Sequence, residues 1–349
     1  MLPVTDHWLP RTPAWSSREP SPFVGAPARP LIVGGCPRSG TTLLRSILDN
    51  HPEIAIPPET NFVLPLWHQR SGFGDLRRPE RRREVAEFVF APGRGGRRIR
   101  GEVSRDEAIN RLFAAPPTLG SLMAACFALY AEGAGKPRWG DKRPRYAMFI
   151  GAIFDLFPDA QFVNVVRDPR GAVASQIPMG WDPPDVALAA SIANWEASIE
   201  RVDAFARRLR PDQLLDLRYE DLVREPEREV RRICAFAGLA AGATVAATLA
   251  ASRQGRRSTP EAVGEPISPA PIASWRERLA PADVALVEHV AAPSLERFGY
   301  LPEAGAAFDG GALAEVRRQR RIRRSRFRRV AGRELARRAV LDRRPVAAA

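Results

Sequence analysis

The feature that most constrains the fold of this chain is a glycine-rich turn between an apolar run and a helical pattern. Residues 31–33 are Leu-Ile-Val, and the turn that follows, residues 34–42, has the sequence GGCPRSGTT. Apolar residues then recur at helical spacing: Leu43, Leu44, Ile47 and Leu48. A strand, a tight turn and a helix in this order open a βαβ unit. The small residues of the turn also let backbone N–H groups converge on an anion at the start of the helix.

Two more apolar runs predict further strands. Residues 162–166 (FVNVV) follow an amphipathic helical pattern over 147–157, and residues 213–217 (QLLDL) precede another helix at about 225–236. Apolar strands that alternate with helices are typical of a parallel sheet covered on both faces. The sequence therefore predicts the α/β class, with a P-loop-type parallel sheet flanked by helices.

Composition divides the chain into three parts. Residues 1–30 contain seven prolines and no hydrophobic period, which predicts an extended lead-in. Residues 31–300 are expected to form the α/β domain, and residues 301–349 a basic C-terminal tail. Within the domain, the charged and glycine-rich segment 70–105 is expected to be an insertion over the sheet edge. Insertions of this kind often carry specificity for an acceptor.

The net charge is concentrated in the tail. The chain has 53 Lys and Arg against 40 Asp and Glu, a net charge of +13, and residues 313–349 account for +11 of it with 14 arginines and three acidic residues. Only the tail therefore needs an acidic partner, either an anionic membrane surface or a nucleic acid. It has too few apolar residues for a core helix. A solvated run is the ordinary expectation, and a basic helix on an anionic surface is the alternative.

Cysteine usage and the first residues argue against several classes of protein. Cys36, Cys126 and Cys234 are far apart and lack metal-ligand spacing, which disfavours a disulfide scaffold and structural zinc. The first 15 residues lack the basic and apolar regions of a signal peptide, and no apolar run is long enough to cross a membrane. We expect a cytoplasmic protein without a metal site.

The glycine-rich turn departs from the pattern that binds triphosphates. Gly35 and Gly40 have the spacing of a phosphate-binding loop, but Thr41 stands where the triphosphate pattern requires lysine. The nearest cation is Arg38, inside the loop. These residues fit a 5′-phosphate that carries some other group, and the alternative is a tight βα turn without a ligand.

Two motifs in a fixed order resemble one known family. Residues 35–44 (GCPRSGTTLL), followed by LDNHP at 48–52, resemble the 5′-phosphosulfate loop of the sulfotransferases that use 3′-phosphoadenosine 5′-phosphosulfate (PAPS). Residues 165–175 (VVRDPRGAVAS) resemble the 3′-phosphate motif of the same family. The likeness extends from about residue 31 to 300 and is closest to the bacterial branch related to tyrosylprotein sulfotransferases.

The resemblance implies transfer of a sulfuryl group from PAPS to an acceptor hydroxyl or amine, with release of adenosine 3′,5′-bisphosphate and without a metal. The acceptor class stays open among small molecules, glycans, lipids and peptides. Arg167 at a strand end and Ser175 two helical turns later can both face a second phosphate, while Asp168 caps the helix between them. The implied nucleotide-binding residues are Arg38, Ser39, Gly40, Thr41, Thr42, Arg167, Ser175 and Tyr219.

The resemblance also implies the residues of the transfer step. Glu59 stands where the tyrosylprotein branch has its catalytic base, and the alternative is an ordinary surface glutamate. His51 is the rival base, although we expect a structural role for it. Lys142 matches the lysine that neutralises the leaving phosphate, with Arg38 supplying further charge. Ser258 matches a serine near the transferring group.

The lysine count supports a chemical role for Lys142. Lys136 and Lys142 are the only lysines in a chain with 51 arginines. Because arginine is the usual cation of this chain, a lysine indicates a position where its own chemistry is needed. A compact ammonium on a flexible stem can follow a leaving oxygen better than a planar guanidinium can. Lys136, between glycine and proline, is expected to be a solvated surface residue.

Two other functions stay open at this point. A kinase-like P-loop phosphotransferase would use the same turn, but the Gly-Lys-Ser/Thr sequence and an evident magnesium carboxylate are missing. A non-catalytic nucleotide-fold module could bind anionic surfaces through the arginine tail, but such a module would not need Glu59 and Lys142. The sequence predicts no oligomeric state.

Overall fold

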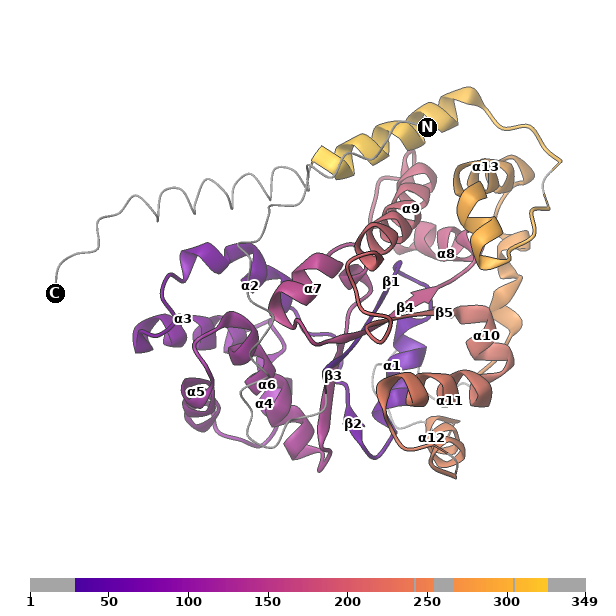
Figure 1. The fold of residues 1–349 in the computed structure, drawn as a ribbon. Coiled ribbons are helices and arrows are strands. Elements are labelled where there is room, and N and C mark those ends of the chain that lie inside the picture. Colours follow the sequence, from indigo (N-terminus) through magenta and orange to yellow (C-terminus); the bar gives the residue numbers. More distant parts are fainter. Residues whose placement is uncertain (1–28, 242, 254–266, 304, 326–349) are drawn as a thin grey trace.

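A computed structural model describes residues 29–241, 243–253, 267–303 and 305–325. Its centre is a five-stranded parallel sheet in the order β2-β3-β1-β4-β5 (Figure 1). The strands are β1 (Leu31–Gly35), β2 (Ile54–Ala55), β3 (Arg138–Lys142), β4 (Gln161–Val166) and β5 (Leu214–Arg218). The predicted α/β class and the three predicted strands are confirmed.

Strand β3 was not predicted, because its sequence RWGDK is polar although all five residues are buried. The guanidinium of Arg138 donates to the Gln161 side chain and to the Ala237 carbonyl, at 2.7 and 2.5 Å. These hydrogen bonds give two of the guanidinium N–H groups a partner. The charge itself is still buried, and burial lowers the pKa of Arg138 to about 10. A polar strand is stable here because its neighbours supply the hydrogen-bond partners.

Helices cover both faces of the sheet (Figure 1). Short 3₁₀ turns occur at Arg70–Gly72, Pro144–Tyr146, Ile177–Met179, Ala270–Ile272 and Ser274–Glu277. The α-helices are α1 (Thr41–Asp49), α2 (Val63–Gln69), α3 (Pro79–Phe90), α4 (Gly96–Arg100), α5 (Arg105–Ala114), α6 (Leu119–Gly133), α7 (Ile150–Leu156), α8 (Pro169–Gln176), α9 (Ala187–Ala206), α10 (Tyr219–Arg224), α11 (Pro226–Ala237), α12 (Ala243–Arg253) and α13 (Pro281–Phe298). Among the described helices, none is long and apolar enough to cross a bilayer.

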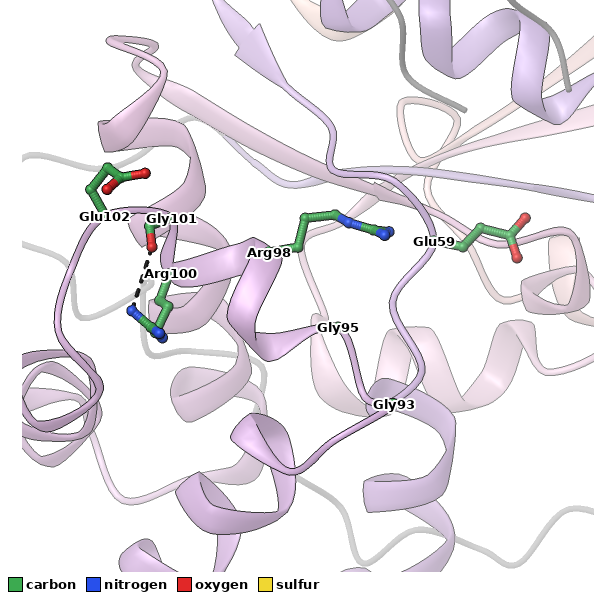
Figure 2. Close-up of a pocket in the computed structure, with 7 residues that line it drawn as sticks. All are labelled: Glu59, Gly93, Gly95, Arg98, Arg100, Gly101 and Glu102. Atoms are coloured by element: carbon green, nitrogen blue, oxygen red, sulfur yellow. Dashed lines mark hydrogen bonds between the residues drawn. The ribbon is translucent and has the colours of Figure 1, made fainter. Parts of the chain in front are cut away.

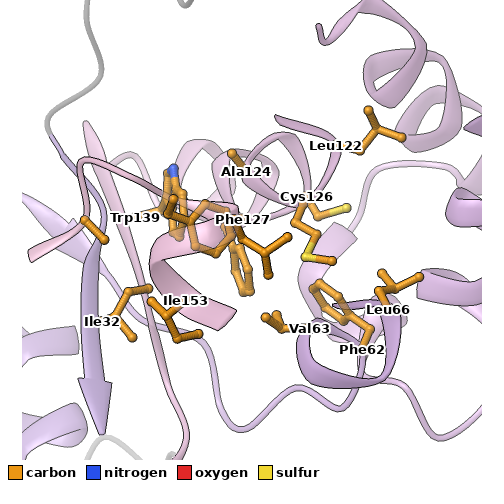
Figure 3. Close-up of a cluster of buried hydrophobic side chains, with 14 of the residues drawn as sticks. Ile32, Phe62, Val63, Leu66, Leu122, Ala124, Cys126, Phe127, Trp139 and Ile153 are labelled. Carbon is orange, nitrogen blue, oxygen red and sulfur yellow. The ribbon is translucent and has the colours of Figure 1, made fainter. Parts of the chain in front are cut away.

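Alternate residues of β1 enter the two cores on either side of the sheet. Ile32 packs with α6 and α7, where Phe127 stacks on Trp139 with ring centroids 4.9 Å apart (Figure 3). Leu31 and Val33 pack on the opposite face with α1, α11 and α12. This alternation fixes the register of β1, because a slip by one residue would exchange the two cores.

The register of the strands brings their carboxyl ends to one edge of the sheet. Val33 pairs with both Lys142 of β3 and Val163 of β4, and Val166 of β4 pairs with Arg218 of β5. The segments that follow β1, β3, β4 and β5 therefore leave the sheet side by side. This edge is where open α/β sheets bind their ligands.

The segment 70–105 packs into the core on one face of the sheet. It carries α3 and α4, and Val85, Ala86, Val89 and Ile99 from these helices are buried in the same cluster as Ile32. Figure 1 shows α3, α4, α5 and α6 together beyond the β2–β3 edge of the sheet. The segment is thus positioned rigidly next to the strand that ends in Lys142.

The expectation of a solvated tail is wrong for residues 310–325. These residues form a helix (yellow in Figure 1), and Val316 is buried among side chains of α8, α9 and α13. The guanidinium of Arg320 lies 3.0 Å from Glu196 and 2.7 Å from Glu200, both on α9. The helix has only a small apolar surface, and ion pairs with α9 therefore add to the packing of Val316 in holding it against the domain. The remaining tail, residues 326–349, lies outside the described residues.

We predict that Arg320→Ala lowers the free energy of unfolding by about 1–2 kcal/mol at pH 8, because it leaves the half-buried Glu196 carboxylate without its cation. Burial raises the pKa of Glu196 to about 7, so at pH 5.5 this carboxyl is protonated and the loss should be smaller. Urea unfolding at both pH values measures the effect. Arg317→Ala, an exposed arginine of the same helix, is the control, and equal losses for the two variants would contradict the assignment.

Candidate active site

The loop between β1 and α1 has the conformation of an anion-binding turn. Gly40 has a φ of 93°, and a Cβ on it would lie 2.3 Å from the Tyr219 ring, so only glycine fits. Arg38, with a φ of 67°, is the only non-glycine residue with positive φ in the described part of the chain. No side chain caps the first turn of α1. The N–H groups of that turn therefore remain available to a ligand.

Buried polar atoms at this loop lack protein partners. The Ser39 hydroxyl is fully buried and has no nitrogen or oxygen partner among the described residues, and only the weakly polar Cys36 thiol lies beside it. The Arg167 Nε, which follows β4 and lies beside Gly171 of α8, also has no partner among the described residues. Buried polar groups are normally satisfied, so the Ser39 hydroxyl fits a site for an anionic ligand.

The structure brings the two sequence motifs into direct contact. The Arg167 guanidinium donates to the Arg38 carbonyl at 3.0 Å and lies over the Tyr219 ring, 4.7 Å from its centroid. The Arg38 Nε in turn donates to the Ser175 hydroxyl at 3.1 Å. Four of the residues expected to bind a nucleotide therefore form one connected group.

Asp168 caps α8, as the sequence indicated, and leaves Arg167 for other partners. Its carboxylate accepts from the Arg170 N–H at 2.9 Å and forms an ion pair with the Arg170 side chain at 2.6 Å. Arg167 instead donates to the carbonyls of Arg38 and Pro271. Burial lowers the pKa of Arg167, so an anion beside it would relieve the cost of its charge.

The backbone around Arg167 is fixed by residues that sequence analysis did not single out. The Trp195 indole donates to the Arg167 carbonyl at 3.0 Å, and the Asp168 N–H donates to the Glu220 carboxylate at 3.0 Å. The Tyr300 hydroxyl donates to the other Glu220 oxygen at 2.8 Å. Glu220 directly follows Tyr219, so the sequence already contained an acidic residue at the end of β5 whose role could have been suspected.

Lys142 links the phosphate loop to Glu59. Its ammonium donates to a Glu59 carboxylate oxygen at 2.6 Å and to the Thr42 hydroxyl at 3.1 Å. The Lys142 side chain is 3% exposed, whereas that of Glu59 is 47% exposed. Burial lowers the pKa of Lys142, and the nearby Glu59 charge acts in the opposite direction. The ammonium is thus held at the boundary between the loop and an open space that Glu59 faces.

The segment that carries Glu59 is clamped to the end of β3. Arg143, the residue after Lys142, donates to the Thr60 carbonyl at 2.5 Å and to the Asn61 side chain at 2.9 Å. Lys142, the last residue of β3, and Arg143, which follows it, therefore hold this segment: Lys142 binds the Glu59 side chain, and Arg143 binds the Thr60 carbonyl and the Asn61 side chain. This clamp was not predicted, since a cation that binds a carbonyl leaves no sequence signature.

A pocket of about 730 Å³ opens on the other side of Glu59 (Figure 2). Besides Glu59, it is lined by residues of the segment that includes α4: Gly93, Gly95, Arg98, Arg100, Gly101 and Glu102. The pocket is large enough for a small-molecule ligand. Glu59 therefore lies between Lys142 on one side and this pocket on the other.

His51 has the structural role that we expected. It is fully buried, its Nδ1 accepts from the Glu53 N–H at 3.2 Å, and its Nε2 lies 3.1 Å from the Ala240 carbonyl. Both ring nitrogens are therefore engaged at the end of α1. Ser258 lies outside the described residues.

The prediction that Lys136 is a solvated surface residue is wrong. Its ammonium donates to the carbonyls of Asp49 and Ile54, the latter at 3.0 Å, and its side chain is only 16% exposed. These carbonyls lie at the end of α1 and in β2, so Lys136 ties the two elements together.

Among the described residues, no group of three His, Cys, Asp or Glu side chains has the arrangement of a metal site.

Comparison with known proteins gives one consistent result. A family model described as "Sulfotransferase family" matches residues 30–242. The chain is 30% identical over 248 residues to nodulation protein NoeE of Sinorhizobium fredii, a match that covers 64% of this chain and 52% of NoeE. It is 28% identical over 214 residues to a protein named putative protein-tyrosine sulfotransferase from Caenorhabditis briggsae, which covers 60% of this chain and 65% of that protein. The chain thus spans about half to two thirds of the length of these relatives.

A solved structure shows the same fold. The sulfotransferase domain of the Synechococcus PCC 7002 olefin synthase aligns with a TM-score of 0.56 at 23% identity, over 79% of this chain and 96% of that domain. At this identity the likeness concerns the fold, which is the parallel sheet and its helices described above.

We predict that replacement by methionine lowers the stability of the protein at Lys136 but not at Lys142. Lys136→Met leaves two backbone carbonyls without their donor and should lower the free energy of unfolding by about 1–3 kcal/mol. Lys142→Met removes an ammonium whose charge burial disfavours, while the half-exposed Glu59 keeps access to water, so stability should stay unchanged or rise. Urea unfolding at pH 7 measures both. A larger loss for Lys142→Met than for Lys136→Met would show that Lys142 is mainly structural.

Proposed function

Since the chain belongs to the sulfotransferase family, we propose that it transfers a sulfuryl group from PAPS to an acceptor hydroxyl or amine and releases adenosine 3′,5′-bisphosphate. The observation that carries this proposal is the position of Lys142, which contacts Thr42 of the phosphate loop and Glu59 of the pocket at the same time. Sulfuryl transfer needs a cation on the leaving phosphate and a base on the acceptor, and these two residues supply them side by side.

The residues of the loop fit the 5′-phosphate end of the nucleotide. We assign the contacts to the backbone of the first turn of α1 and to the side chains that surround it: Arg38, Ser39, Gly40, Thr41 and Thr42. The buried Ser39 hydroxyl supports this assignment, because it has no nitrogen or oxygen partner in the protein and a bound anion would supply one. When bound, PAPS supplies the sulfuryl group and a phosphate that can leave.

The second group of residues fits the 3′-phosphate and the nucleoside. We assign the 3′-phosphate to Arg167 and Ser175, which both contact Arg38 in the structure. Tyr219 lies beneath the Arg167 guanidinium and beside Gly40, which supports its assignment to nucleotide binding.

The transfer step needs a proton acceptor on the pocket side and positive charge on the loop side. Glu59 is one of the residues that line the pocket, and its carboxylate is held on Lys142 at the edge of this pocket, so we assign it the proton of the acceptor hydroxyl or amine. Lys142 and Arg38 stabilise the negative charge that develops on the leaving phosphate. Ser258 keeps its assignment from the family resemblance alone.

The alternative functions are less well supported. A kinase-like phosphotransferase would need lysine after Gly40, where this chain has Thr41. A non-catalytic module would not need the contact between Glu59 and Lys142.

The acceptor and the location of the protein belong to the proposal too. The acceptor is a small molecule, a glycan, a lipid or a peptide, and we place the protein in the cytoplasm.

The helix of residues 310–325 limits which arginines can bind an external partner. Its Arg320, Arg323 and Arg324 form ion pairs with acidic side chains of the chain itself. An anionic membrane surface or a nucleic acid would therefore have to bind the arginines that face outward, such as Arg317 and Arg321.

We predict that adenosine 3′,5′-bisphosphate binds at least tenfold more tightly than AMP, and without magnesium, because AMP lacks the phosphate assigned to Arg167 and Ser175. Arg167→Ala should weaken the binding of the bisphosphate by about 1.5–3 kcal/mol and change that of AMP much less. Isothermal titration calorimetry with both nucleotides measures the difference. Arg231→Ala, a surface arginine on α11, is the control. Equal affinities for the two nucleotides would remove the 3′-phosphate assignment.

We predict that Glu59→Gln lowers turnover by about 10²- to 10⁴-fold, because it keeps the shape of the side chain and removes the base. The affinity for adenosine 3′,5′-bisphosphate should hardly change. Labelled PAPS is first incubated with the protein and a cell extract, and the labelled product identifies the acceptor. Turnover is then measured as transfer of label from PAPS to this acceptor. Glu87→Gln on α3, an exposed glutamate away from the pocket, is the matched control. Turnover by Glu59→Gln at the rate of this control would place the base elsewhere.

A further inference from the structure

The pocket beside Glu59 is also lined by charged residues on the side of α4. Three of its lining residues are the glycines Gly93, Gly95 and Gly101, and all three have positive φ, at 76°, 89° and 54°. Glycine is needed at these positions for the backbone conformation, and its lack of a side chain leaves the pocket open. The charged residues of the wall, Arg98, Arg100 and Glu102, therefore decide what the pocket can bind.

Arg98 is the arginine of this wall that is available to a ligand. The Arg100 guanidinium donates to the carbonyls of Gly101 and Val103, at 3.5 and 2.5 Å, and so holds its own loop. Arg94 lies over the Phe88 ring and donates to the Asn61 carbonyl. The Arg98 side chain is exposed, and no carboxylate of the described residues pairs with it. Figure 2 shows it extending from α4 toward the segment that carries Glu59.

The loop that carries Arg98 is joined to the segment that carries Glu59. The Asn61 N–H donates to the Arg94 carbonyl at 2.9 Å, and the Arg94 guanidinium donates back to the Asn61 carbonyl at 3.3 Å. A Cβ on Gly95 would lie 3.4 Å from the Thr60 Cα, so the two backbones are in contact. Ile99, next to Arg98, is 1% exposed and anchors α4 in the core. The segments that carry Arg98 and Glu59 are therefore held in a fixed relation to each other. In Figure 2 the Glu59 carboxylate extends away from Arg98, so an acceptor that contacts both side chains must reach past the Glu59 segment.

We propose that this pocket binds a small-molecule acceptor that carries an anionic group, a carboxylate or a phosphate ester, and that Arg98 binds this group while the acceptor hydroxyl lies at Glu59. The proposal rests on the proposed function, since it takes Glu59 as the base. A guanidinium presents paired N–H donors that match both kinds of anion. An anionic group is repelled by Glu59 and Glu102 and attracted by Arg98, so the charges of the wall orient the acceptor with its hydroxyl toward the base.

The test compares matched alcohols as acceptors. A panel of hydroxycarboxylic acids and monophosphorylated alcohols is assayed with labelled PAPS beside a neutral counterpart of each member, which is the methyl ester or amide of each acid and the dimethyl triester of each phosphate. We expect the anionic members to have a kcat/KM at least tenfold above their neutral counterparts. Arg98→Gln should remove this preference by raising KM for the anions about 10- to 100-fold, with adenosine 3′,5′-bisphosphate binding unchanged. Arg105→Gln, an exposed arginine at the start of α5, should behave like the wild type.

Equal kcat/KM for anionic and neutral members, or an unchanged preference in Arg98→Gln, would overturn the proposal. If no member of the panel takes up label, binding of the same alcohols is measured by saturation-transfer NMR with adenosine 3′,5′-bisphosphate present. Binding of the anionic members that Arg98→Gln abolishes would support the pocket assignment and place the failure on the proposed chemistry. No binding, or binding that Arg98→Gln leaves intact, would overturn the pocket assignment.

Discussion

The structure of the site depends on one buried ammonium with two different neighbours. Lys142 is the last residue of β3, and its pairing with Val33 sets it beside the end of β1, where the phosphate loop begins. From there its Nζ contacts Thr42 on the loop and Glu59 at the pocket. Burial makes this charge unfavourable for the folded chain, and the Glu59 carboxylate offsets part of this cost. We propose that this ammonium stabilises the negative charge of a substrate.

The two nucleotide motifs are also held together by an unusual backbone. Arg38 adopts positive φ, and its carbonyl accepts the hydrogen bond from Arg167, 129 residues further along the chain. Its side chain reaches Ser175 in the second motif. A left-handed arginine is a local strain of the kind that persists where the surrounding structure fixes it, and such strain is concentrated at functional sites. The buried Ser39 hydroxyl at the same loop, which lacks a nitrogen or oxygen partner, fits this interpretation.

The parts of the fold that were predictable are those with an apolar pattern or a glycine turn, namely β1, β4 and β5 and the loop after β1. Strand β3 was missed because it owes its stability to partners from distant segments, such as the Ala237 carbonyl that binds Arg138. Lys136 was assigned to the surface for the same reason, since its two carbonyl partners leave no trace in the sequence. The segment 70–105 was recognised as a candidate acceptor element, but only the structure shows that Arg98 shares a pocket with Glu59.

The presence of only two lysines allows the central contact to be measured directly. Protein labelled with ¹³C at the lysine ε-carbons gives two signals, which Lys136→Arg assigns, and their pH dependence reports each pKa. The account predicts that Lys142 titrates below the ordinary lysine value of about 10.4, and lower still in Glu59→Gln, where the stabilising carboxylate is gone. Addition of adenosine 3′,5′-bisphosphate should raise its pKa. A Lys142 signal at the ordinary value that neither Glu59→Gln nor the nucleotide moves would contradict the account.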